Sequence, residues 1–309
     1  MSEDLRIIVM GQQAFGKDVL EKIISAGKDK VIAVYCEPDR EGKPVDPIKV
    51  AAQEHGVPVF QPAHFKEQAT IDQLAAHEAD LMIMAFVNVF VPEAARDTPR
   101  LGSICFHPSL LPLHRGPSAV NWPIIMGSEK SGYSWFYPSD GLDEGDILLQ
   151  WVCDIEPDDT VINLYFKKIY PSAVDSALEV CNLFRSGEPP HIEQKESDAT
   201  YERRCTKKHA RIDWNKPVNQ VYNLIRGTNP APGAWTSYKG TELDIFDSSR
   251  THGDGVSSRI MSVSEEGIEV QAIGGRVLVK RVRSKGGDKM SAFDWATEVG
   301  LALGDELGS

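Results

Sequence analysis

The chain has 309 residues, of which 41% are hydrophobic and 25% charged; this is ordinary for a soluble globular protein and long enough for two domains. Its net charge at pH 7 is −12, but residues 1–199 hold 31 acidic and 17 basic residues, whereas residues 200–309 hold 14 and 16. The acidity of the first part argues against a large polyanion such as tRNA as the main ligand. Apolar runs such as Leu81–Val87 are far short of a membrane span, and no signal-peptide pattern opens the chain, so a cytoplasmic location without a membrane partner is expected.

The first hundred residues alternate short apolar strands with amphipathic helices. Strands are expected over 5–10, 31–36, 57–60, 81–86 and 104–107, and helices over 15–26, 47–55 and 71–78. Asp46 is the predicted N-cap of the second helix, and Pro47 suits its first position. This βαβ repetition predicts an α/β fold with a doubly wound, mostly parallel sheet.

After Pro117 the pattern becomes mixed. We expect a helix over 119–126, an antiparallel strand pair over 133–137 and 147–155, a long helix over 160–186 and a polar linker within 186–206. A short helix around 217–226 and several strands between glycine turns follow, which predicts a small β-barrel-like (OB-like) domain. The expected domains are therefore 1–203, carrying the catalytic site, and 204–309.

The five cysteines, at positions 36, 105, 153, 181 and 205, show no paired close spacing. They fit a reducing compartment better than a disulfide framework or a zinc site, and no metal is expected. The glycine turn GQQAFG, at 11–16, lacks the GxGxxG spacing of a dinucleotide site. It is interpreted as a turn that edges a substrate pocket, with Gln12 at the entrance.

A histidine and an aspartate, His107 and Asp143, form the strongest candidate site. Because Pro108 ends the strand at His107, the imidazole is expected at the carboxyl edge of the sheet, where open α/β sheets bind ligands. Asp143 lies 36 residues later in the acidic turn SDGLDEGD, where Gly141 and Gly145 permit left-handed backbone. A His held by an Asp suits proton transfer at neutral pH. The alternatives are a structural His and a surface acidic turn, or a weak cation site without EF-hand spacing.

His107, the SLLP run at 109–112, Arg115-Gly116 and Asp143 resemble the pattern of the folate-dependent formyltransferase family. Within that family the chain is most similar to the amino-terminal hydrolase domain of 10-formyltetrahydrofolate dehydrogenase, and more distantly to methionyl-tRNA formyltransferase. The resemblance is dense over residues 100–250. It implies a Rossmann-like first domain that takes 10-formyltetrahydrofolate as one-carbon donor, with His107 as the acid/base and Asp143 ordering it.

The resemblance also implies where the folate and the acceptor lie. The pterin would bind the loop Phe86, Val87, Asn88, Val89 and Phe90 together with Asp140 and Gly141. Backbone groups at Val87, Val89 and Asp140 would read its polar edge, although Phe86 and Phe90 could instead belong to the core. Gln12, Ser109 and Arg115 would lie at the substrate entrance; Arg115 shapes the loop and is not catalytic.

Cys105 stands where the family carries an asparagine that donates a hydrogen bond to the formyl oxygen. The dehydrogenase's hydrolase domain also lacks that asparagine. Losing one such donor costs roughly 2.7–4 kcal/mol, or about 10²–10³ in rate, and a thiol is a weak substitute. Cys105 is therefore either a small residue filling the asparagine's place or, as a thiolate, a catalytic acceptor of the formyl group.

The formyl acceptor stays open at this point. Water, which gives formate and tetrahydrofolate, follows from the greatest similarity. The main alternative is an amine, on methionyl-tRNA, an amino sugar or an amino acid, and another is a thiol on a separate acyl-carrier-type protein. A folate-binding module that has lost catalysis is the alternative of a different class.

Overall fold

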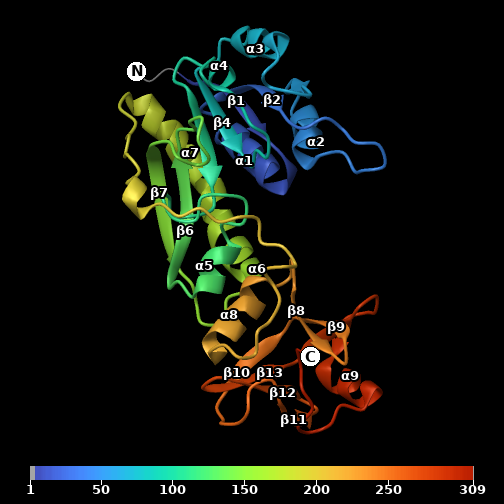
Figure 1. The fold of residues 1–309 in the computed structure, drawn as a ribbon. Helices are drawn as coiled ribbons and strands as arrows, with labels where there is room; N and C mark the ends of the chain where they lie inside the picture. The colour runs from blue at the N-terminus through green and yellow to red at the C-terminus, as the bar shows by residue number, and fades with distance from the viewer. Residues whose placement is uncertain (1–3, 309) are drawn as a thin grey trace. The chain divides into compact units, whose positions relative to one another are not determined.

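The computed structural model describes residues 4–308, which divide into two compact units interleaved along the chain (Figure 1). Unit 1 consists of the chain up to Arg115 together with Gly132–Val152 and Lys168–Tyr201. Unit 2 consists of Gly116–Ser131, Cys153–Lys167 and the chain from Glu202 on. The last segment of unit 1 thus ends two residues before position 203, where the sequence predicts the domain boundary.

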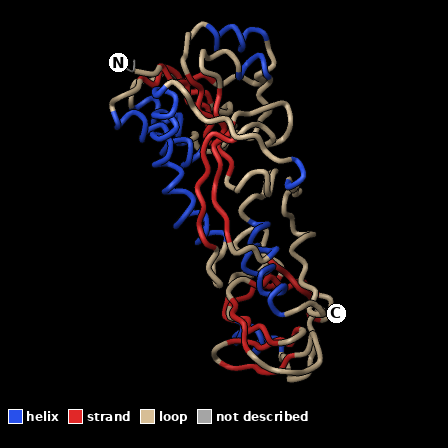
Figure 2. The backbone as a smooth tube through the Cα atoms, turned by 90° about the vertical axis from the view of Figure 1, so that its left-hand side faces the viewer, coloured by secondary structure: helices blue, strands red, loops and turns tan. Residues whose placement is uncertain are grey.

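Seven strands form one sheet in the order β3-β2-β1-β4-β5-β6-β7. They are β1 (Arg6–Gly11), β2 (Lys30–Tyr35), β3 (Val59–Phe60), β4 (Leu81–Ala85), β5 (Ser103–His107), β6 (Lys130–Phe136) and β7 (Ile147–Asp154). The first five strands pair in parallel and β6 runs antiparallel to β5. Figure 2 shows these strands as one red layer. The predicted α/β class with a mostly parallel sheet is confirmed.

Helices cover both faces of this sheet: α1 (Gln13–Ala26), α2 (Pro47–Glu54), α3 (Gln68–Ala75), α4 (Glu93–Arg96) and α7 (Tyr170–Ser186). On one face, Ile8 and Met10 of β1 share a core with Leu74 of α3 and Ala95 of α4. Helix α1 packs against α2 and α7, and the Phe15 ring lies 4.4 Å from that of Phe106. The predicted cap is confirmed, because Asp46 Oδ1 accepts a hydrogen bond from the Ile48 amide (3.1 Å).

The long helix predicted over 160–186 is confirmed, because the chain is helical without a gap from Val161 to Ser186. Within it, a short α6 (Val161–Leu164) is followed by a π-helical turn (Tyr165–Ile169) before α7 begins at Tyr170. Thr160 caps the helix, accepting from the Asn163 amide at 3.4 Å. Pro171 accounts for the π-helical turn, since a proline ring has no N–H and clashes with the carbonyl four residues earlier.

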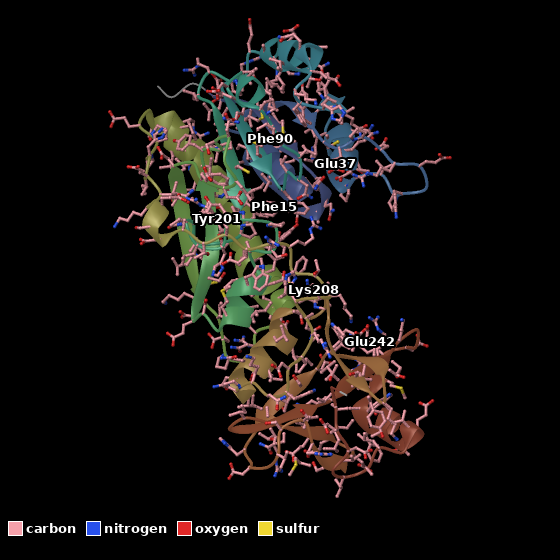
Figure 3. All side chains as sticks on the ribbon, in the orientation of Figure 1. Phe15, Glu37, Phe90, Tyr201, Lys208 and Glu242 are labelled. Atoms are coloured by element: carbon pink, nitrogen blue, oxygen red, sulfur yellow. The ribbon has the colours of Figure 1, made fainter. Side chains whose placement is uncertain are left out.

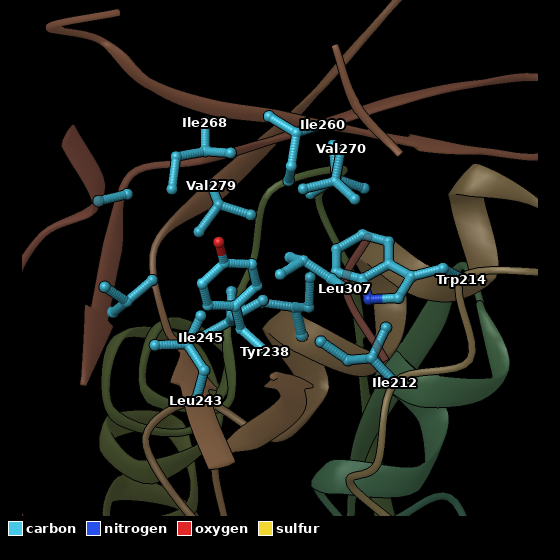
Figure 4. Close-up of a cluster of buried hydrophobic side chains, with 14 of the residues drawn as sticks. Ile212, Trp214, Tyr238, Leu243, Ile245, Ile260, Ile268, Val270, Val279 and Leu307 are labelled. Atoms are coloured by element: carbon cyan, nitrogen blue, oxygen red, sulfur yellow. The ribbon is translucent and has the colours of Figure 1, made fainter. Parts of the chain in front are cut away.

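The strand-rich part of unit 2 contains two four-stranded antiparallel sheets. One has the order β10 (Ser248–Thr251), β13 (Gly275–Val279), β12 (Gly267–Ala272), β11 (Ile260–Ser264); the other β15 (Met290–Ser291), β14 (Arg281–Ser284), β9 (Thr241–Ile245), β8 (Ala234–Tyr238). Helices α5 (Asn121–Met126), α8 (Val218–Gly227) and α9 (Ala292–Val299) belong to the same unit. The core of this part of unit 2 contains apolar side chains such as Trp214, Ile245 and Ile260 (Figure 4). A separate small β-rich carboxyl-terminal domain is confirmed.

The first part of the segment predicted as a linker is instead anchored to unit 1. Ile192 exchanges two backbone hydrogen bonds with Ile147, and Gln194 is buried. A short 3₁₀ turn (Glu196–Asp198) follows. Separately, none of the helices within residues 4–308 is long and apolar enough to cross a membrane.

Candidate active site

The His107 side chain is buried at the carboxyl end of β5, with its two ring nitrogens facing different partners. Nε2 lies 2.9 Å from the carbonyl oxygen of His114. Because a carbonyl can only accept a hydrogen bond, Nε2 must carry a proton. Nδ1 faces Asp143, whose Oδ2 lies 3.6 Å away. Nδ1 is therefore the nitrogen that can exchange a proton with a bound molecule.

The His107–Asp143 pair is close enough for an ion pair but too long for a direct hydrogen bond. Both side chains are largely withdrawn from solvent, 9% and 16% exposed, so charge in this pair is weakly screened. Catalytic contacts that are long in the absence of substrate commonly tighten when substrate binds. The structure thus brings together the two residues on which the predicted acid–base pair depends.

Asp143 itself adopts the left-handed backbone that the sequence assigns to Gly141 and Gly145 (φ 58° at Asp143). That expectation for the two glycines is wrong. Gly145 is needed for space, because a Cβ there would lie 1.6 Å from the Tyr137 carbonyl oxygen. A Cβ at Gly141 would meet only the end of the Glu144 side chain, which can move. Aspartate tolerates the left-handed region better than most residues, which makes this conformation accessible to Asp143.

The loop between His107 and Arg115 is held by internal hydrogen bonds. Ser109 is fully buried; its hydroxyl donates to the Leu113 carbonyl (2.7 Å), and its own carbonyl accepts from Ser134 Oγ (2.7 Å). The amide of Gln150 donates to the Leu111 carbonyl (2.7 Å). Ser109 therefore fixes the loop that carries His107. From the sequence it is expected at a substrate entrance, but its side chain is buried within the loop.

Arg115 is also buried, 1% exposed, and does not line an entrance. Its guanidinium donates two hydrogen bonds to Gln194 Oε1 (2.9 and 3.2 Å) and one to Glu196 Oε2 (2.9 Å), and it contacts Tyr201 Oη. Gln194, Glu196 and Tyr201 were not predicted as site residues. They lie 79 to 86 positions from Arg115, and no local sequence pattern predicts a contact over that separation.

Cys105 is half-buried and packs between two apolar clusters, one with Met84 and one with Phe136. Burial, and secondarily the charge of Asp143, raise the pKa of the Cys105 thiol far above its ordinary value. The thiol therefore stays protonated near pH 7. This environment disfavours a thiolate nucleophile and suits a small residue that fills space.

A cavity of about 350 Å³ opens at the carboxyl ends of β1, β2, β3 and β4. It is lined by Gln12 and by all five residues of the predicted pterin loop, Phe86–Phe90, together with apolar side chains such as Met10 and Phe65. Its size suits a small ligand. His107, Asp143, Asp140 and Gly141 are not among its lining residues.

Two features of the cavity wall are unusual for a protein core. Gln12 is a polar residue of the wall that is nonetheless buried, 5% exposed. Phe86 has a left-handed backbone (φ 65°), a conformation that bulky residues rarely adopt. Phe90 is 67% exposed on the loop after β4 (Figure 3), so it does not belong to the core.

Asp140 is exposed and pairs with the buried guanidinium of Arg96 (2.8 Å), which also donates to the Val91 carbonyl (3.2 Å). Arg96 was not predicted, and it ties the turn at Asp140 to the end of the pterin loop. Among residues 4–308, no three His, Cys, Asp or Glu side chains are grouped to hold a metal ion.

The family model described as formyl transferase matches residues 5–170, and the model of the formyl transferase carboxyl-terminal domain matches residues 204–300. Cytosolic 10-formyltetrahydrofolate dehydrogenase of Xenopus laevis is 36% identical over 98% of this chain, which covers 35% of that protein. The chain thus spans about a third of the length of that relative. Methionyl-tRNA formyltransferase of Geotalea daltonii is 30% identical, with 98% of each chain covered.

Solved structures show the same fold. HypX of Aquifex aeolicus, crystallised with tetrahydrofolic acid, superposes with a TM-score of 0.68 at 17% identity, over 98% of this chain and 48% of HypX. An N-formyltransferase of Helicobacter canadensis, in complex with folinic acid and dTDP-3-aminofucose, gives 0.66 at 17% identity, over 89% and 98% of the two chains. With both of its domains matched by family models, the chain belongs to the formyl transferase family.

Proposed function

We propose that the chain cleaves the formyl–nitrogen bond of 10-formyltetrahydrofolate and passes the formyl group to water, giving formate and tetrahydrofolate. The observation that carries this proposal is the buried His107–Asp143 pair, in which the hydrogen bond from Nε2 to the His114 carbonyl turns Nδ1 toward the carboxylate. The 36% identity to a 10-formyltetrahydrofolate dehydrogenase supports the choice of donor.

In the proposed reaction, water adds to the formyl carbon and the carbonyl oxygen becomes an oxyanion. Asp143 orders the water and takes up its proton, while protonated Nδ1 of His107 stabilises the oxyanion. Collapse of the adduct breaks the carbon–nitrogen bond, and the folate nitrogen leaves with a proton delivered by the pair. The cavity lined by Phe86–Phe90 would hold the pterin, with Gln12 providing a polar contact at its wall.

Cys105 would act as a space-filling residue in this scheme. A protonated thiol is a weak hydrogen-bond donor, so His107 must provide more of the oxyanion stabilisation than in relatives with an asparagine. Its raised pKa also speaks against a covalent formyl-thioester on Cys105. The proposed enzyme is therefore slow compared with asparagine-containing relatives, by up to about 10²–10³.

Transfer to an amine is the second candidate, and one observation favours it. The methionyl-tRNA formyltransferase of Geotalea daltonii is 30% identical over 98% of this chain, including the carboxyl-terminal domain. Against tRNA stands the acidity of residues 1–199.

Product analysis separates the two candidates. Purified protein is incubated with 10-formyltetrahydrofolate alone, and then with methionyl-tRNA, an amino sugar nucleotide or free amino acids. Release of formate without added amine, lowered by orders of magnitude but still measurable in His107→Ala and Asp143→Asn, supports hydrolysis. Formylated amine at the expense of formate supports transfer. If no product forms and folate still binds, the chain is a binding module and the enzyme proposal fails.

The substitution Cys105→Asn tests the role assigned to position 105. Restoring an amide donor should raise formyl transfer, by up to about 10²-fold. Cys105→Ala is the matched control and should leave turnover within a fewfold of the parent protein. Loss of turnover in Cys105→Ala would instead indicate that the thiol takes part in the chemistry.

A further inference from the structure

The buried amide of Gln194 makes four hydrogen bonds, and all of them join segments of the candidate site. Its Nε2 donates to the main-chain carbonyls of Asp143 (2.9 Å) and Gly145 (2.7 Å). Its Oε1 accepts two bonds from Arg115. Both amide hydrogens and both oxygen lone pairs are thus used, at a side chain that is 7% exposed.

The two segments joined by Gln194 are those that carry the reacting pair. Arg115 ends the loop that begins at His107, and the carbonyl of the preceding residue, His114, holds the Nε2 proton of His107. Asp143 occupies the turn that supplies the carboxylate. The four hydrogen bonds of Gln194 go to Arg115 and to main-chain carbonyls of the Asp143 turn, so their effect on chemistry acts through the placement of these two segments.

Other contacts of the same stretch reinforce this connection. Thr200 Oγ1 accepts from the His114 amide (2.8 Å), and the Thr200 carbonyl accepts from the Arg115 amide (3.0 Å). The Tyr201 hydroxyl donates to Glu144 Oε1 (2.8 Å), on the turn beside Asp143. Residues 194–201 therefore bond both to the loop that follows His107 and to the turn that carries Asp143.

The left-handed backbone at Asp143 explains why the turn needs an external support. A non-glycine residue at φ 58° costs free energy relative to ordinary backbone, and such a conformation persists only where its surroundings hold it. Two hydrogen bonds from one amide, to the carbonyl of Asp143 itself and to that of Gly145 two residues later, provide that support. Without them the carboxylate can move away from Nδ1 of His107.

We infer that Gln194 is a positioning residue, which holds the Asp143 turn at the distance from His107 that formyl cleavage requires. The inference rests on the proposed function of that pair. Misplacing a catalytic group by about 1 Å can cost 10²-fold in rate, so the expected loss in Gln194→Met is about 10²-fold in kcat with a small change in KM for the folate. A residue needed only for folding would lower the active fraction or the stability instead.

The test is a double-mutant cycle between Gln194→Met and Asp143→Asn, with activity measured per folded protein. If Gln194 acts through Asp143, adding Gln194→Met to Asp143→Asn should cost less than about twofold further in kcat. Equal losses in both backgrounds would overturn the inference. Should Gln194→Met not fold, Gln194→Glu keeps the acceptor for Arg115 and removes the two donors, and the same cycle applies.

Gln271 offers a matched control in unit 2. It is a buried glutamine whose Nε2 donates to the carbonyls of Ala272 (2.8 Å) and Gly275 (2.9 Å) and whose Oε1 accepts from Arg276 (3.2 Å). Gln271→Met should lower stability as much as Gln194→Met does, without the loss of kcat. An equal loss of kcat in Gln271→Met would show that the effect is one of general stability.

A readout without turnover separates this inference from the proposed function. The ¹⁵N resonances of the His107 ring report its tautomer and the group facing Nδ1. Gln194→Met and Asp143→Asn should change the Nδ1 resonance in the same direction, and Gln271→Met should not. An unchanged Nδ1 resonance in Gln194→Met overturns the inference. Absence of turnover in the parent protein would overturn the proposed function alone.

Discussion

The loops that follow two neighbouring strands, β5 and β4, leave the same edge of the sheet but differ in how deeply their side chains are buried. The loop after β5 turns inward: Ser109 and Arg115 are almost fully buried and every anchor described above is a hydrogen bond within unit 1. The loop after β4 turns outward, with Phe90 67% and Val89 43% exposed. The first loop follows His107, the proposed acid/base, and the second lines the cavity.

We relate this difference in burial to the two tasks of the proposed site, proton transfer and folate binding. Proton transfer depends on fixed distances, so its groups need a loop whose geometry is set before substrate arrives. A loop that binds a flat, partly apolar ligand gains from apolar side chains that become buried only in the complex. Stability and binding should therefore respond to opposite sets of substitutions.

The largest stability effect is expected at Arg115. Arg115→Ala leaves Gln194 Oε1 buried without either of its donors and opens a cavity, so the free energy of unfolding should fall by about 3 kcal/mol. Chemical denaturation measures this change. The control is Lys130→Ala, which breaks an exposed pair with Asp154 and should leave the unfolding transition nearly unchanged. An equal loss of unfolding free energy in the two variants would contradict the conclusion that buried hydrogen bonds hold the loop after β5.

A smaller effect, on binding alone, is expected at Phe90. Phe90→Ala removes an exposed ring that the folate would bury, so KM for 10-formyltetrahydrofolate should rise about tenfold with kcat nearly unchanged. The free energy of unfolding should change by less than about 0.5 kcal/mol. Steady-state kinetics and denaturation measure the two quantities. A stable variant with unchanged KM would remove Phe90 from the proposed binding site.

The smallest effect concerns Cys105. Because its pKa is raised, the thiol deprotonates only as the pH rises well above the ordinary range, and labelling by iodoacetamide should be negligible from pH 6.5 to 8.5. Peptide mapping by mass spectrometry measures the modified fraction. In denaturant all five cysteines should react, which controls for the reagent. Rapid labelling at pH 6.5 would indicate an activated thiolate.

Much of the fold follows from local patterns in the sequence. Alternating apolar strands and amphipathic helices predict the parallel sheet, and the Asp46-Pro47 pair marks the start of α2. The helix predicted over 160–186 is confirmed, but the π-helical turn inside it, next to Pro171, was not predicted. Apolar periodicity does not show where a proline changes the hydrogen bonding of a helix.

The site was predictable in its reacting groups but not in its support. His107 and Asp143 stand at a strand end and in a glycine-flanked turn, and both signals are local. Arg115 and Gln194 meet across 79 positions, so neither reveals from its own surroundings that it is buried against the other. The resemblance to the formyltransferase family placed Arg115 at an entrance, and nothing in its local sequence indicated its burial.

The interleaving of the two units bears on how the polypeptide can be divided. A gene cut after codon 203 would separate Asn121 from Gly227, whose carbonyl accepts from its side-chain amide (2.8 Å), and Asp158 from Tyr222, whose hydroxyl donates to it (2.7 Å). Both contacts lie within unit 2. The amino-terminal fragment would carry two stretches of an incomplete second unit, with apolar faces open to self-association. Two co-expressed fragments, in contrast, are expected to reassemble through these same contacts. Position 203 therefore suits a split complementation reporter better than a truncation.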